Sequence, residues 1–194
     1  MGIDKNKKDC ILVEAAQKFA QWGFKKTSMD EIAKAAGVAK GTLYLVSKSK
    51  EELFYQVLTR QLRRWDMEVL EDIDPSMPAD QQLLEASQRS IETMNKYPLI
   101  RDFFFGKYSS LLPSIKAKVP ELRTLSLGPI REILQTGIRQ GTFKKEMNVE
   151  QVANILLDLM TATFLFHMNA QTDMEDLRER EATAFDLIFN GIRV

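Results

Sequence analysis

The stretch VAKGTLYLVSKSKEELF concentrates basic and hydroxyl side chains that suit contact with a nucleic acid. Lys40, Thr42 and Tyr44 follow a turn that contains a glycine, and Lys48 and Lys50 come next along the chain. Ammonium groups bind phosphates and the edge of guanine, and hydroxyls bind phosphates or bases. The stretch therefore predicts a DNA-contacting surface, although a solvated charged face of an ordinary helical protein has a similar composition.

The remaining reactive side chains form no catalytic or metal-binding pattern in the sequence. Cys10 is the only cysteine and His167 is the only histidine. A lone histidine and a distant cysteine support neither a metal site nor a Cys–His catalytic pair, and the sequence has no phosphate-binding loop motif. We expect no cofactor, no metal and no enzymatic activity; an all-helical enzyme with a vestigial DNA motif stays as an alternative.

The two ends of the chain differ in charge, although the net charge is zero. Residues 1–64 contain 13 Lys and Arg against 7 Asp and Glu, whereas residues 65–194 contain 14 against 20. A basic N-terminal part on an acidic body indicates an anionic partner for the first part only. Charge alone fits sequence-specific DNA binding, a membrane surface, or a non-specific or architectural DNA-binding protein, and the last stays open as an alternative function.

The composition indicates a soluble protein of the reducing cytoplasm. The chain has 194 residues, 44% of them apolar, and its single cysteine excludes an internal disulfide. Its N-terminus, MGIDKNKKD, is charged and lacks a signal-peptide pattern. The most apolar run, ILLDLMTATFLFHM, is shorter than a membrane span and contains Asp158, so we expect no membrane partner.

Apolar residues recur at helical spacing along the chain, and strand-like alternation and hairpin signals are missing. The sequence therefore predicts an all-α fold of about nine helices. A domain boundary is expected near residue 50, inside a long helix, so that a domain of residues 1–49 is joined rigidly to a domain of residues 50–194. The predicted helices span residues 7–22, 29–35, 39–45, 50–72, 79–95, 98–108, 120–140, 149–168 and 174–192.

Two of the short helices have the spacing of a helix-turn-helix. Counted from Met29, the fifth position is Ala33, which lets a second helix cross closely, and the ninth is Gly37, which accepts a left-handed turn. With the helix before them they are expected to form a three-helix domain, whose last helix can enter a DNA major groove with its N-terminal residues toward the bases. Nearby helix N-termini add phosphate-binding groups. The candidate DNA contacts are Thr27, Ser28, Ala39, Lys40, Gly41, Thr42, Tyr44, Lys48 and Lys50.

Residues 11–54, ILVEAAQKFAQWGFKKTSMDEIAKAAGVAKGTLYLVSKSKEELF, resemble the N-terminal domain of the TetR family of bacterial transcriptional repressors. The resemblance rests on the paired Ala15-Ala16, Phe19, Gly23-Phe24, Thr27, the IAKAAGV run, GTLY and the SKEEL close. It implies a helix-turn-helix DNA-binding domain followed by a larger C-terminal helical domain for ligand binding and dimerisation. It also implies a repressor that leaves a near-palindromic DNA operator when a small-molecule effector binds.

The same resemblance implies a homodimer formed by the last two helices, residues 149–168 and 174–192. One departure from the family pattern concerns the end of the recognition helix, where an aromatic residue, a histidine and a phenylalanine usually stand. Here the residues are Leu45, Val46 and Ser47. This departure removes two potential phosphate contacts. It also removes the phenylalanine ring that fills the joint between the recognition helix and the long helix, so Leu45 or Val46 is expected to fill that space.

Phe103, Phe104 and Phe105 are consecutive, and on a helix they fan over about 200°. Either that helix is buried all round or some of its rings line a cavity for a bulky apolar effector. Asp158, if it faces that cavity, favours a cationic ligand, and a solvent or interface role is its alternative; His167 is a core or interface residue or a ligand partner. The candidate pocket residues are Trp65, Met94, Phe103, Phe104, Tyr108, Asp158, Met160, Phe164 and His167.

Overall fold

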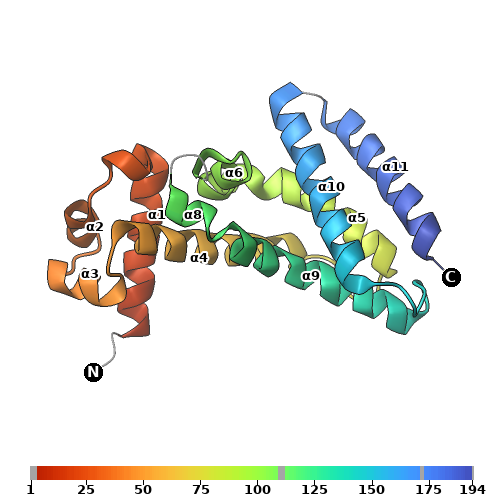
Figure 1. Cartoon of the computed structure of the whole chain (residues 1–194), viewed down its shortest axis with the longest axis horizontal. Helices are drawn as coiled ribbons and strands as arrows, with labels where there is room; N and C mark the ends of the chain where they lie inside the picture. Colours follow the sequence, from red (N-terminus) through yellow and green to blue (C-terminus); the bar gives the residue numbers. More distant parts are fainter. Residues whose placement is uncertain (1–3, 109–111, 171–172, 194) are drawn as a thin grey trace. The chain divides into compact units, whose positions relative to one another are not determined.

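The computed structural model describes residues 4–108, 112–170 and 173–193 of the chain, the side chains of 169 and 170 excepted. These residues contain ten α-helices, one short 3-10 helix and no strand, so the predicted all-α class is confirmed (Figure 1). The 3-10 helix, η1, spans Met94–Lys96. The α-helices are α1 (Lys5–Lys26), α2 (Met29–Ala35), α3 (Lys40–Val46), α4 (Lys50–Leu70), α5 (Ala79–Thr93), α6 (Pro98–Phe104), α8 (Pro113–Lys116), α9 (Val119–Gln140), α10 (Val149–Ala170) and α11 (Met174–Ile192).

Two predicted helices differ from the structure. The helix predicted over residues 98–108 is interrupted, because α6 ends at Phe104 and Gly106 follows with a φ of 70°. The first helix continues to Lys26, but Gly23 still breaks its geometry with a φ of 74°, where the prediction ended it. The short helix α8 begins at Pro113, a residue that the prediction assigned to a break between helices.

The chain packs as two compact units. The first comprises Met1–Arg63 and Tyr97–Val119, and the second comprises Arg64–Lys96 and Pro120–Val194. These packing units divide the residues differently from the predicted functional domains, because the first half of α4 packs with the N-terminal helices. The functional division into residues 1–49 and 50–194 therefore stays a prediction.

An aromatic cluster fixes the core of the first unit. The ring of Phe54 on α4 lies 4.9 Å from that of Phe19 and 5.3 Å from that of Phe24, both on α1. Tyr108 also packs against Phe54, with 4.7 Å between ring centroids. Edge-on aromatic contacts of this kind add to the free energy gained by burial. The cluster holds α1 against α4 and thereby provides the base on which α2 and α3 are packed.

The core of the second unit is apolar and is formed by α5, α9, α10 and α11. Gly137 on α9 lies against the buried ring of Phe143, so closely that no side chain fits between them. The buried core residues are Ala79, Leu83, Leu127, Ile130, Ile133, Leu134, Phe143, Ala153, Leu156, Leu157, Phe185 and Phe189.

The helix α10 is more apolar than its burial explains. Its segment Val149–Met168 reaches a mean hydropathy of 1.3, enough by length and composition to cross a membrane, and 22% of that window is buried. The predicted absence of a membrane span rested on the lack of a long uninterrupted apolar run, and Asp158 does interrupt this one. An interface helix of a soluble protein shows the same combination of apolar composition and exposure.

Candidate functional site

The helix-turn-helix has the geometry that the spacing predicted. The side chain of Ser28 accepts from the backbone N–H of Glu31 and caps α2, and the Glu31 carboxylate accepts in turn from the backbone N–H of Ser28. Gly37 turns the chain with a φ of 62°. The backbone N–H of Val38 then donates to the carbonyl of Ala33 at 3.0 Å. These local bonds direct the chain into α3.

The helix α3 presents small and polar residues to solvent. Its apolar anchor is Leu43, which is fully buried, whereas Ala39, Lys40, Gly41 and Tyr44 are exposed and Thr42 is partly exposed. Small residues near the start of the helix permit a close approach of the backbone to a partner. The structure therefore brings five of the nine predicted DNA contacts onto one short exposed segment.

Lys40 is paired within the chain. Its ammonium lies 2.7 Å from the carboxylate of Asp30 on α2, and this hydrogen-bonded partner raises the pKa of Lys40. Both side chains are more than half exposed, and exposed ion pairs of this kind contribute little free energy. A phosphate or a guanine edge can therefore replace Asp30 as the partner of Lys40.

Two of the predicted phosphate contacts are engaged within the chain. Thr27 is buried, and its hydroxyl donates to the carbonyl of Gly23 at 2.9 Å. The Ser28 hydroxyl is exposed but donates to Glu31 Oε2 at 2.8 Å. With Asp30 and Glu31 in its first turn, α2 repels phosphate at its N-terminus. The hydroxyls of Thr27 and Ser28 favoured a phosphate site in the sequence, and the two neighbouring carboxylates oppose one.

Lys50 is also a structural residue. Its ammonium donates to the carbonyls of Phe24 and Thr27, both at 2.9 Å, and lies 4.5 Å from the centre of the Phe24 ring. These contacts tie the start of α4 to the end of α1. Lys48 is exposed, and its backbone N–H donates to Glu52 Oε2 at 2.7 Å. Of the two lysines, Lys48 is the more exposed.

Replacement of Lys50 by methionine is expected to destabilise the protein by about 1–2 kcal/mol, because two carbonyls lose a charged donor that water replaces only in part. Urea unfolding of Lys50→Met measures this change. The matched control is Lys48→Met, for which we expect a change within about 0.5 kcal/mol. Equal losses of stability in the two variants contradict the structural role of Lys50.

The joint between α3 and α4, where the sequence departs from the family pattern, is polar. Ser47 is buried, and its hydroxyl donates to the carbonyl of Ser49 at 3.0 Å. Gln56 donates from Nε2 to the carbonyl of Val46 at 3.2 Å. Leu45 is 77% exposed and does not fill the joint. Hydrogen bonds therefore stabilise a junction where the family pattern has an aromatic ring.

A cavity that opens to solvent lies within the second unit. Trp65 and Met160, two of the predicted pocket residues, line it. Apolar side chains from α5, α9 and α10 form most of the rest of the wall. Such a wall suits a ligand with an apolar body. The lining residues are Trp65, Asp66, Val69, Leu70, Leu83, Ala86, Ser90, Ser126, Pro129, Ile130, Ile133, Leu157 and Met160.

The other predicted pocket residues do not line this cavity. Phe103, Phe104 and Tyr108 belong to the first unit. Asp158 lies on the surface, with its side chain 67% exposed and 2.7 Å from the guanidinium of Arg123. The remaining three, Met94, Phe164 and His167, belong to the second unit and are not among the lining residues. Helical spacing shows which residues share a face of one helix, but it does not determine which faces of different helices meet around the cavity.

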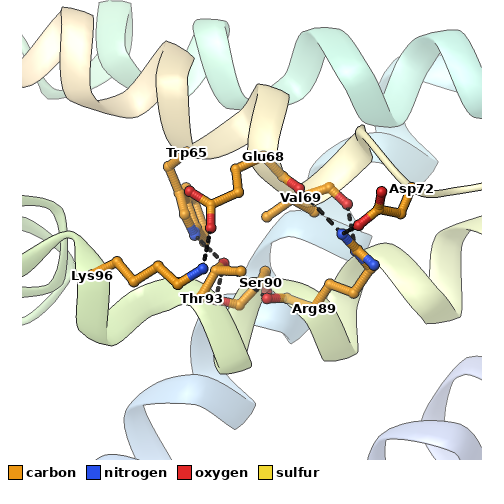
Figure 2. Close-up of polar contacts among 8 residues, drawn as sticks. All are labelled: Trp65, Glu68, Val69, Asp72, Arg89, Ser90, Thr93 and Lys96. Carbon is orange, nitrogen blue, oxygen red and sulfur yellow. Dashed lines mark hydrogen bonds and ion pairs between the residues drawn. The ribbon is translucent and has the colours of Figure 1, made fainter.

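The position of Trp65 is fixed by a polar belt between α4 and α5 (Figure 2). The indole Nε1–H donates to the hydroxyl of Thr93 at 2.9 Å. Arg89 on α5 donates to the carbonyl of Val69 on α4 at 2.9 Å. The same guanidinium pairs with the carboxylate of Asp72, which follows the end of α4, at 2.8 Å. Because its polar edge is engaged by Thr93, the indole offers its apolar surface to the cavity.

Asp66 is the one ionisable residue of the cavity lining, and the sequence did not predict it there. It lies on the apolar face of α4, at helical spacing from Leu62, Val69 and Leu70. A carboxylate within an apolar stripe was the signal that could have identified it. Burial raises the pKa of Asp66 to about 7. A carboxyl group in the wall of an apolar cavity therefore changes its charge near neutral pH.

Asp66→Asn is expected to stabilise the protein most at pH 8 and hardly at all at pH 4. The carboxyl pKa is 3.8 in a model compound and about 7 in the fold. Between these values the unfolded state loses the proton and the folded state keeps it, so the destabilising contribution grows as pH rises and is complete above pH 7. Thermal melting of both proteins from pH 4 to pH 8 measures the difference. A gain in melting temperature that does not depend on pH contradicts this assignment.

Comparison with known proteins relates the whole arrangement to one family. Residues 11–57 match the family model described as "Bacterial regulatory proteins, tetR family". The HTH-type transcriptional regulator YhgD of Bacillus subtilis is 31% identical over 163 residues, which cover 84% of this chain and 83% of the relative. The HTH-type transcriptional repressor KstR2 of Mycolicibacterium smegmatis is 28% identical, with 79% of this chain and 75% of the relative covered.

Among solved structures, FadR of Bacillus subtilis in complex with stearoyl-CoA has a TM-score of 0.68 and 24% sequence identity. The match covers 95% of this chain and 99% of that protein. This likeness extends the agreement in fold to the C-terminal helices, where the family model does not reach.

Proposed function

Because the chain belongs to the TetR family of bacterial regulatory proteins, we propose that it is a ligand-responsive repressor that binds a near-palindromic operator. The observation that carries this proposal is a helix-turn-helix with an exposed recognition helix, in a chain whose second unit contains an apolar cavity. The relative KstR2 is named as a repressor, and FadR was solved with stearoyl-CoA. The protein acts in the cytoplasm and catalyses no reaction.

The proposed operator contacts come from α3 and the residue that follows its end. Ala39 and Gly41 allow α3 to lie deep in the major groove, where Lys40 and Tyr44 reach base edges. Lys48 contacts a phosphate beside the groove. This assignment keeps residues 1–49 as the DNA-binding domain and gives effector binding and dimerisation to residues 50–194.

Lys48→Met is expected to weaken binding to all duplexes about equally and to lower the slope of log affinity against log salt by about 1. Lys40→Gln is expected to relax the preference for one base pair instead, since a base contact carries sequence information and a phosphate contact does not. Fluorescence anisotropy with labelled duplexes at several salt concentrations measures both effects. Lys145→Met, an exposed lysine of the second unit, is the control that leaves both quantities unchanged.

The proposal as a whole is tested with DNA from upstream of the protein's own coding sequence. Specific binding there at moderate salt is the expected result. The proposal is contradicted if the protein binds neither this DNA nor any member of a broad operator library.

Dimerisation is proposed to use the exposed apolar residues of α10 and α11. Ile155 and Phe166 on α10 are 54% and 48% exposed, and Leu187 on α11 is 72% exposed. A second copy of the chain that packs its own α10 and α11 on this surface forms a symmetric four-helix arrangement. Such a dimer places two recognition helices on two half-sites.

The proposed route from ligand to operator runs along α4. This helix is continuous from Lys50 to Leu70; it contributes Phe54 to the core of the first unit and Trp65 to the cavity of the second. A ligand that binds more tightly to one of two conformations that differ in the placement of α4 shifts the population between them, and with it the fraction of protein that can bind DNA. The coupling requires no further element between the two sites.

A further inference from the structure

We propose that the effector cavity selects a ligand with a cationic group on an apolar body, and that the carboxylate of Asp66 receives this group. The inference rests on the proposed function for its biological meaning, since it names the class of the effector. It depends structurally on the cavity alone. Its central observation is that Asp66 is the one ionisable residue in an otherwise uncharged lining.

The chemistry of the wall singles out Asp66. The lining residues from α5, α9 and α10 are all uncharged, and on α4 the residues beside Asp66 are Trp65, Val69 and Leu70. The only other side-chain oxygens in the lining belong to Ser90 and Ser126. The Ser90 hydroxyl is engaged, because it donates to the carbonyl of Ser87 at 2.6 Å. No lining residue therefore supplies a positive charge for Asp66.

A buried carboxylate without a compensating cation is costly, and a ligand cation removes that cost. An apolar molecule without charge fills the cavity but leaves Asp66 uncompensated. An anionic head group placed there adds repulsion to the desolvation of Asp66. The wall consequently ranks ligands of one shape in the order cation, neutral molecule, anion.

Trp65 strengthens this ranking. Its indole lines the cavity next to Asp66, while its N–H is engaged by Thr93. Tryptophan is the aromatic side chain that attracts cations most strongly through its ring face. A carboxylate and an indole on one wall together form a site for an ammonium-type group, with the aliphatic residues of α9 and α10 around the apolar body.

The test uses three probes with the same alkyl chain and different head groups: octylammonium, octanol and octanoate. Binding is followed by the fluorescence of Trp65 in a Trp22→Phe background, which leaves Trp65 as the only tryptophan. We expect octylammonium to bind at least about 10-fold more tightly than octanol at pH 8, the strength of a charge-assisted contact, and octanoate to bind most weakly. Equal affinities for octylammonium and octanol overturn the inference, and so does failure of all three to bind.

Two variants identify the residue responsible. In Asp66→Asn the preference for octylammonium over octanol is expected to fall to less than about 2-fold. Asp158→Asn is the matched control, because it removes a carboxylate of the same unit that lies on the surface beside Arg123. A preference that persists in Asp66→Asn, or that disappears in Asp158→Asn, overturns the assignment.

The unmodified cavity provides a second measurement that needs no change at Asp66. Octylammonium affinity is expected to rise from pH 6 to pH 8 as Asp66 loses its proton, whereas octanol affinity is not. The cavity contains no other ionisable lining group that titrates in this range. A flat profile for octylammonium contradicts the proposal.

DNA binding separates this inference from the proposed function. Each probe is added to the complex with a duplex selected from a randomised library. If octylammonium binds selectively but no probe changes the affinity for DNA, the cavity assignment stands and the ligand response fails. If octanol releases DNA as well as octylammonium does and binds equally tightly, the ligand response stands and the cationic selectivity fails.

Discussion

Leu187→Glu is expected to convert a dimer into a monomer that binds its operator at least about 100-fold more weakly. Leu187 is the most exposed large apolar residue of α11, with 72% of its surface accessible. A carboxylate buried at the centre of an apolar interface lacks a partner, which costs several kcal/mol. A monomer reads one half-site and loses the millimolar effective concentration that links the second recognition helix to its own half-site.

Light scattering after size-exclusion chromatography gives the oligomeric state, and anisotropy gives the affinity for DNA. Ile155→Glu on α10 is expected to act in the same way. Met67→Glu is the matched control, because Met67 is 65% exposed but lies on α4, outside the proposed interface. If both interface variants stay dimeric with full affinity, dimerisation does not use α10 and α11.

Gly137→Ala is expected to destabilise the protein by about 1–3 kcal/mol, the usual cost of overpacking a well-packed core. A Cβ atom at this position lies 2.3 Å from Cδ2 and 2.5 Å from Cε2 of Phe143. It also lies 2.8 Å from Cβ of Ala79. Phe143 is fully buried, so its ring moves only at the expense of the core around it.

Urea unfolding monitored by circular dichroism measures the loss. Gly128→Ala on the same helix is the control, because a Cβ there meets no atom within 4 Å outside its chain neighbours and its own helix backbone. Its expected effect lies within about 1 kcal/mol of zero, since helix propensity favours alanine and the following Pro129 disfavours a Cβ in helical backbone. The double variant Gly137→Ala, Phe143→Leu is expected to recover part of the lost stability. Equal effects of alanine at positions 137 and 128 rule out the predicted clash.

The helix-turn-helix could be predicted from the sequence because its requirements are local. The positions of Ala33 and Gly37 within one short segment determine the crossing and the turn, and the structure confirms both elements. The roles of Lys50 and Thr27 could not be predicted in this way. Their partners, Phe24 and Gly23, both lie on α1, and composition cannot show that a basic or hydroxyl side chain is already engaged.

The cavity was predicted only in part, for a related reason. Apolar spacing marks residues that are buried, and it identified Trp65 and Met160. It does not determine how α4, α5, α9 and α10 rotate against one another, so it left Asp158 with a pocket role and a solvent role. The structure has Asp158 on the surface and Asp66 in the cavity lining. Both residues interrupt an apolar helix, and only the packing of neighbouring helices separates a surface ion pair from a cavity wall.

The most direct test of the central claim, that α3 of a dimer reads an operator, is selection of the purified protein against a randomised duplex library at moderate salt. Recovery of a near-palindrome with half-site centres about one helical turn apart is the predicted result. Salt-sensitive binding without any recovered motif contradicts the claim and indicates a non-specific DNA-binding protein instead.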